Sequence, residues 1–182
     1  MMIQLFRNSF LLIAMLACVS CLPVKPGATK SGGGLYETFF VGDEGTQYFI
    51  KPLEIKGEQK NEMSLDMTFR YKNDINTSVT VNFSVISDSN LRQIDSLLVV
   101  NSQYSLSLTN ADYMYSEKVK TGYRSRFSAK AGLKDVKSAF ADGNWLLYLY
   151  KGPDLLKFKG DKGLAKKIAS LNSEVFDLVM EE

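Results

Sequence analysis

The chain has 182 residues and a formal net charge of +2, with 45% hydrophobic and 12% aromatic residues. This length suits one domain with a core of its own, and the nearly balanced charge argues against nucleic acid as a partner. The sequence contains no histidine, which excludes Ser-His-Asp and Cys-His catalysis and histidine-ligated zinc. Carboxylate, lysine and tyrosine chemistry stay open.

Residues 1–20 have the pattern of an export signal. One cation, Arg7, precedes an apolar run at 9–17 that is shorter than the ~20 residues a membrane-spanning helix needs. A basic start, a short apolar middle and small residues before the break are typical of a secretory signal. A buried helix or a single anchor helix is the alternative, but Pro23, Pro26 and the glycines of "SGGG" would end such a helix early.

Both cysteines stand at the end of this apolar run, in "AMLAC" and "ACVSC". The stretch resembles the lipobox of bacterial lipoproteins, in which a cysteine becomes the acylated first residue of the mature chain. Cys21 is the preferred lipidation site because Ser20 precedes it and a linker follows, whereas Cys18 is the alternative because its preceding residues fit the general pattern better. The resemblance covers residues 1–21 alone. Since no aspartate follows either cysteine, it implies an outer-membrane anchor, and we expect the domain to face the periplasm.

The sequence therefore predicts a signal peptide at 1–20, a lipid-anchored flexible linker at 21–34 and a single β-rich domain at 35–182. Prolines stiffen the start of "LPVKPGATKSGGG", and glycines and serine loosen its end.

Alternation of apolar and polar residues predicts strands through most of the domain. It is clearest at 62–72 and 77–87, which we expect to form an antiparallel hairpin. Further strands are predicted at 35–42, 46–57, 92–101, 104–110 and 155–159, and Pro52 indicates a bulge or a sheet edge in the second of these. One or two strands are predicted at 112–130. A central strand that is buried on both faces is predicted at 144–150.

Helical spacing replaces this alternation twice. Leu133, Val136 and Phe140 predict a helix within 132–143, and Asp161 is placed to cap a helix over 161–178, with Ser173 as a second cap. The predicted fold is mainly β, with β-sandwich-like antiparallel sheets, one internal helix and one C-terminal helix.

A row of cations is the most suggestive feature of the domain. Lys118, Lys120, Arg124, Arg126 and Lys130 occupy even positions and would share one face of a single strand. Like charges in a row repel, so such a face favours an anion: a lipid headgroup, a lipopolysaccharide phosphate or an acidic protein surface. The alternative is a solvated outer face that deters edge-to-edge aggregation.

The sequence gives no catalytic residue, metal ligand or cofactor site. The calcium-loop, phosphate-loop and nucleophile motifs are missing, and "GDEG" is best explained as a solvated turn. We expect an outer-membrane lipoprotein that is not an enzyme. It would act as a scaffold or binding subunit of an envelope assembly, with the membrane and an envelope protein as partners.

A type VI-like secretion apparatus is one candidate assembly, by analogy with its small lipidated β-sandwich subunits. The alternatives are a cell-wall glycan hydrolase with paired carboxylates and a carrier of a lipid or small ligand. A hydrolase requires two facing carboxylates in a groove, and a carrier requires an apolar internal cavity.

Overall fold

The computed structural model describes residues 29–31, 34–73 and 77–180. The predicted signal peptide, both cysteines and most of the predicted linker lie outside the described residues. One part of that linker belongs to the sheet, because Thr29–Ser31 form a short strand, β1, which pairs with the start of the domain. The boundary predicted at residue 34 therefore falls inside a strand pair.

The described strands form one antiparallel sheet. They are β1 (Thr29–Ser31), β2 (Tyr36–Phe40), β3 (Thr46–Gly57), β4 (Glu62–Tyr71), β5 (Ser78–Ser87), β6 (Ser96–Val100), β7 (Ser105–Thr109), β8 (Asp112–Val119), β9 (Gly122–Gly132), β10 (Leu146–Lys151) and β11 (Asp154–Lys159). The main path runs β7-β6-β10-β11-β3-β4-β5-β9-β8, while β2 pairs with β3 and β1 with β2.

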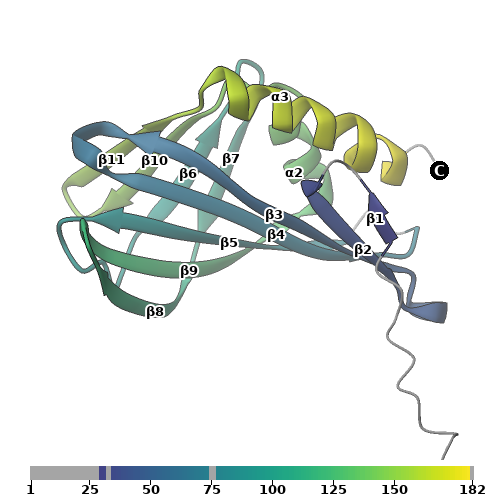
Figure 1. The fold of residues 1–182 in the computed structure, drawn as a ribbon, viewed down its shortest axis with the longest axis horizontal. Helices are drawn as coiled ribbons and strands as arrows, with labels where there is room; N and C mark the ends of the chain where they lie inside the picture. Colours follow the sequence, from purple (N-terminus) through teal and green to yellow (C-terminus); the bar gives the residue numbers. More distant parts are fainter. Residues whose placement is uncertain (1–28, 32–33, 74–76, 181–182) are drawn as a thin grey trace, which may run out of the picture.

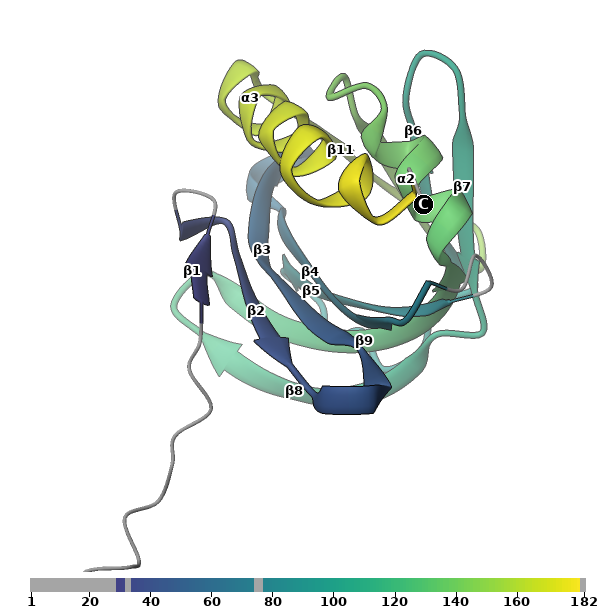
Figure 2. The same ribbon diagram turned by 90° about the vertical axis from the view of Figure 1, so that its right-hand side faces the viewer.

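The sheet curls around the core, and two helices lie across its concave side (Figures 1 and 2). These are α2 (Leu133–Phe140), between β9 and β10, and α3 (Lys162–Leu171), after β11. Their buried stripes meet the inward side chains of the strands, among them Phe83 and Phe127. The predicted mainly β fold with one internal and one C-terminal helix is confirmed, and its strands belong to one continuous curled sheet.

The hairpin predicted at 62–72 and 77–87 is confirmed as β4 and β5. Leu65 lies opposite Phe83 on the buried face, and Asp66 lies opposite Asn82 on the outer face. Alternation of apolar and polar residues thus assigned each side chain to the correct face. These two strands form the middle of the wall that carries the candidate site.

Pro52 marks an irregularity in β3, as predicted. The pairing of β3 with β4 shifts between Ile50 and Leu53, because proline has no N–H to donate to a ladder. On its other edge β3 pairs with β2 over its first part and with β11 at its end. On this side the middle of β3 therefore has no partner among the described strands.

The prediction that residues 144–150 are buried on both faces is wrong. β10 does lie inside the sheet, between β6 and β11, but only Leu147 and Leu149 are buried, while Leu146 and Tyr150 are exposed. No described element covers the outer face of the curled sheet there, so apolar residues on that face stay in contact with solvent.

The C-terminal helix begins as predicted and ends differently. The Asp161 carboxylate accepts the backbone N–H of Leu164, which caps α3. Ser173 is not a second cap, because its hydroxyl donates backwards to the carbonyl of Ala169. The chain continues through a π-helical turn, Asn172–Phe176, and a 3-10 turn, Leu178–Met180.

Among the described helices, none combines the length and the apolar character that crossing a membrane requires.

Candidate functional site

The predicted row of cations is divided between two strands. β8 and β9 form a hairpin whose turn contains Lys120, so the residues from 118 to 130 are not one strand. Arg124, Arg126 and Lys130 alternate along the outer face of β9, whereas Lys118 pairs with Tyr123 on the opposite face. The expectation that all five share one face is wrong, because the chain reverses at 120–121.

The cations on the outer face have partners. The Arg126 guanidinium lies 2.7 Å from the Asp66 carboxylate and donates to the Ser84 hydroxyl, and Asp66 also accepts a hydrogen bond from Asn82. Arg124 pairs with Glu117 at 2.8 Å, and Lys130 donates to a threonine hydroxyl. These partners compensate much of the positive charge, so the anion-binding role of the row stays a prediction.

β8 is one free edge of the sheet; β7, at the other end of the main path, and β1 are edges as well among the described strands. Tyr113 lies opposite Phe127 and Tyr115 lies opposite Arg126, which leaves Met114 as an extra residue in a β-bulge. The bulge places Tyr113 and Tyr115 on opposite faces. All three side chains are exposed, Met114 at 52%. Among the described strands β8 pairs only with β9, so its other edge presents backbone donors and acceptors that no strand uses.

A hollow of about 310 Å³, here called the outer groove, extends from β8 across the outer face to β3. Its lining residues are Pro52, Glu54, Glu62, Met63, Ser64, Ser84, Ile86, Tyr115, Arg124 and Arg126. The groove joins Tyr115 and Ile86 to the two arginines, so it offers apolar and charged contacts side by side.

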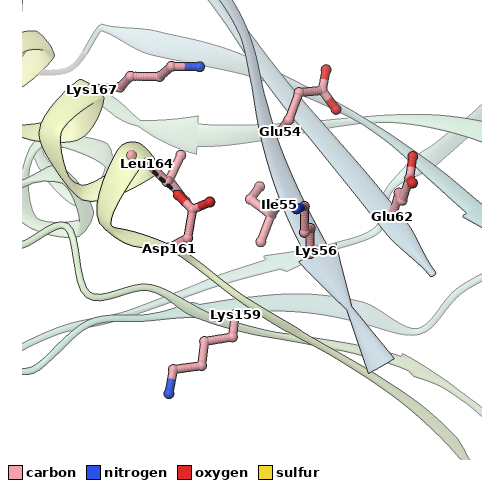
Figure 3. A pocket seen from close by; sticks show the side chains of 9 residues that line it. Glu54, Ile55, Lys56, Glu62, Lys159, Asp161, Leu164 and Lys167 are labelled. Carbon is pink, nitrogen blue, oxygen red and sulfur yellow. Dashed lines mark hydrogen bonds between the residues drawn. The ribbon is translucent and has the colours of Figure 1, made fainter. Parts of the chain in front are cut away.

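A second hollow of about 360 Å³, here called the α3 hollow, lies where β3 and β11 meet the start of α3 (Figure 3). It shares Glu54 and Glu62 with the outer groove. Its other charged residues are Lys56, Lys159, Asp161 and Lys167. In Figure 3 Lys167 extends from α3 on the same side as Glu54, whereas Lys159 points away from both.

The surroundings of the α3 hollow shift the pKa values of two carboxyl groups in opposite directions. Partial burial, with repulsion from Glu62, raises the pKa of Glu54, although Lys167 and Arg124 oppose this. The hydrogen bond from the Leu164 backbone N–H lowers the pKa of Asp161. Because both acidic and basic groups line this space, it suits a ligand or chain segment with charges of both signs better than a polyanion.

The described residues contain no cluster of three or more metal-ligating side chains. Sequence reasoning missed two features of this region. The pair Glu54 and Glu62 is assembled by the register of β3 against β4, which the spacing of the two residues does not reveal. The exposed edge had a signal in "DYMY", where large residues follow one another and interrupt the alternation.

Comparison with known protein-family models, with curated proteins and with solved structures finds no match to this chain.

Proposed function

We propose that this chain is a lipid-anchored, non-catalytic binding subunit of the bacterial envelope that holds a protein partner along β8. The lipobox-like cysteine supports the anchor. The observation that carries the binding role is the first half of the β8 edge, where Tyr113, Met114 and Tyr115 are exposed in succession beside backbone groups that no described strand uses.

Such an edge is unusual for a protein that acts alone. Natural sheets protect their edges with charged residues, and the second half of β8 follows this rule with Glu117 and Lys118. The stretch from Tyr113 to Ser116 carries no charge. An extended segment of a partner that adds a strand here would satisfy the backbone groups and cover the large side chains.

The outer groove supplies specificity next to this edge. Tyr115 belongs both to β8 and to the wall of the groove, so a partner on the edge extends naturally onto Arg124 and Arg126. Tyrosine and arginine are enriched at the energetic centres of protein interfaces. The predicted role of these arginines thus becomes part of a protein contact.

Cross-linking in intact cells, followed by capture of the full chain from solubilised envelope, tests this proposal. We expect Met114→Lys to abolish specific partner bands, because a charge in the middle of the edge opposes strand addition. Leu155→Lys, at an exposed apolar position on β11, is the matched control and should retain them. Arg124→Ala measures the contribution of the cations in the outer groove separately.

An unchanged partner set in Met114→Lys would reject the β8 contact. The identity of the captured proteins also tests the predicted association with a type VI-like secretion apparatus. Fractionation of the same cells tests the predicted outer-membrane location and its periplasmic orientation.

The two alternative functions have less support. A glycan hydrolase would use Glu54 and Glu62, which share two open hollows. A carrier would need apolar space within the curled sheet, where side chains such as Phe83, Phe127 and Trp145 are packed together in the core.

A further inference from the structure

The hairpin of β2 and β3 carries the most exposed aromatic residue among the described residues. Phe40 is 77% exposed and Val41 follows it, while Phe49 is exposed on β3. The ring of Phe39 packs edge-on against Phe49 on one face of the hairpin, with 5.5 Å between centroids, and Phe40 points to the other face. We call these four residues the aromatic tip.

The aromatic tip is held in place by backbone hydrogen bonds. Val41 donates its N–H to the carbonyl of Gly45 at 2.8 Å, and a 3-10 turn, Gly42–Glu44, closes the hairpin. A Cβ atom at Gly45 would lie 2.1 Å from the Tyr71 carbonyl oxygen, so this turn is pressed against the end of β4. The apolar side chains are therefore displayed on a fixed support.

The segment that leads to the cysteines leaves the domain beside this tip. β1 runs antiparallel to β2, with Ser31 opposite Tyr36 and Thr29 opposite Thr38. Thr29 is thus the end of β1 nearest Phe39 and Phe40. In Figure 1 the hairpin between β2 and β3 and the start of β1 lie at the same end of the molecule.

The length of the remaining chain limits how far the anchor can be from the tip. Residues 22–28 separate Cys21 from Thr29, which allows about 25 Å at full extension. With Cys18 as the anchor, residues 19–28 allow about 35 Å. Both limits place the membrane surface within reach of the aromatic tip.

We propose that the aromatic tip inserts into the lipid leaflet that holds the anchor, and that this contact fixes the orientation of the domain on the membrane. The proposal rests on the lipid anchor in the proposed function. The transfer of phenylalanine and valine side chains from water into lipid is favourable in free energy. A lipid anchor holds a protein on the membrane more stably when a second membrane contact assists it. Of the two carboxylates in the turn, Glu44 is paired with Arg70, whereas Asp43 is exposed and would stay among the lipid headgroups. In Figure 1 β8 lies toward the opposite end of the molecule from the β2–β3 turn, so its edge stays available to a protein.

Fluorescence quenching by brominated lipids tests this contact. The acylated full chain is reconstituted in vesicles of phosphatidylethanolamine and phosphatidylglycerol with brominated acyl chains. Trp145 is the single tryptophan and is buried, so it contributes a constant background. We expect bromine to quench Phe40→Trp several times more strongly than Met114→Trp, the matched control at an exposed position on β8. Phe49→Trp provides a second probe of the tip.

Mass spectrometry of the same preparations separates the two proposals. An acylated chain whose Phe40→Trp and Phe49→Trp emission is quenched no more than that of Met114→Trp overturns the membrane contact and leaves the anchor intact. A chain without acylation at Cys18 or Cys21 overturns both proposals. Selective quenching at the tip of an acylated chain supports both.

Discussion

Asp66 and Arg126 form the best-protected ion pair on the outer face. Their side chains are 16% and 21% exposed, and Asn82 and Ser84 complete their hydrogen bonds. The pair joins β4 to β9 across β5, so it stabilises the wall that carries the outer groove. Arg124 and Glu117, by contrast, pair where both side chains are largely in solvent.

Removing one partner should reveal this difference. We expect Asp66→Ala to lower the free energy of unfolding by about 1–3 kcal/mol, because it leaves Arg126 partly buried without a counter-charge. Glu117→Ala should cost less than about 1 kcal/mol, as exposed pairs contribute little. Urea unfolding monitored through Trp145 measures both, and equal losses would contradict the argument.

At the scale of single elements, the capped start of α3 makes the stability of the fold depend on pH. The pKa of Asp161 is lowered in the folded state, first by the hydrogen bond from the Leu164 backbone. Its carboxylate therefore stabilises the fold above its ordinary pKa, and this contribution is lost as the pH falls through the folded-state pKa. The raised pKa of Glu54 acts in the opposite direction and favours the fold at lower pH.

We expect Asp161→Asn to reduce the acid-dependent loss of stability, because asparagine also caps helices but does not titrate. Thermal unfolding followed across the range from neutral pH to about pH 2, well below the ordinary aspartate pKa, checks this. Asp154→Asn, at the start of β11, serves as the control for the change in charge. If both variants show the same slope as the unsubstituted chain, the cap does not contribute to the pH dependence.

The elements themselves were largely predictable from local sequence. Alternation gave the strands and their faces, and the residues at helical spacing gave α2 and the start of α3. The β8–β9 turn and the bulge at Met114 were not predictable in the same way. Cations continue at even-numbered positions on both sides of the turn, so the sequence pattern does not show where the chain reverses. Gly122 has a φ of 141°, and a Cβ there would lie 2.3 Å from the Ser87 carbonyl oxygen, a contact that appears only after folding.

For the whole molecule, the C-terminal segment closes the open side of the curled sheet. Phe176 is fully buried, with its ring centroid 4.6 Å from that of Phe140 on α2 and 6.1 Å from that of Phe69 on β4. The last described turns are thus part of the core. Which strands they pack against could not be predicted from local sequence, because strand order and curvature depend on contacts between distant residues.

Removing the buried Phe176 ring should destabilise the entire domain. We expect Phe176→Ala to lower the free energy of unfolding by about 3–5 kcal/mol, since it opens a cavity between α2 and β4. Leu178→Ala, two residues later and 63% exposed, should change stability by less than about 0.5 kcal/mol. Denaturant unfolding of both variants measures the difference, and a small loss for Phe176→Ala would mean that the segment packs loosely.

The antiparallel pairing of β1 with β2 has a mechanical consequence for a tethered domain. If the proposed anchor pulls on the chain, the force acts on Thr29, at the open end of the strand pair, and the three residue pairs would separate one after another, starting with Thr29 and Thr38. Unzipping in this order needs less force than sliding all pairs at once. Detachment of residues 29–35 from the sheet would lengthen the tether by up to about 25 Å before any strand of the main path bears the force.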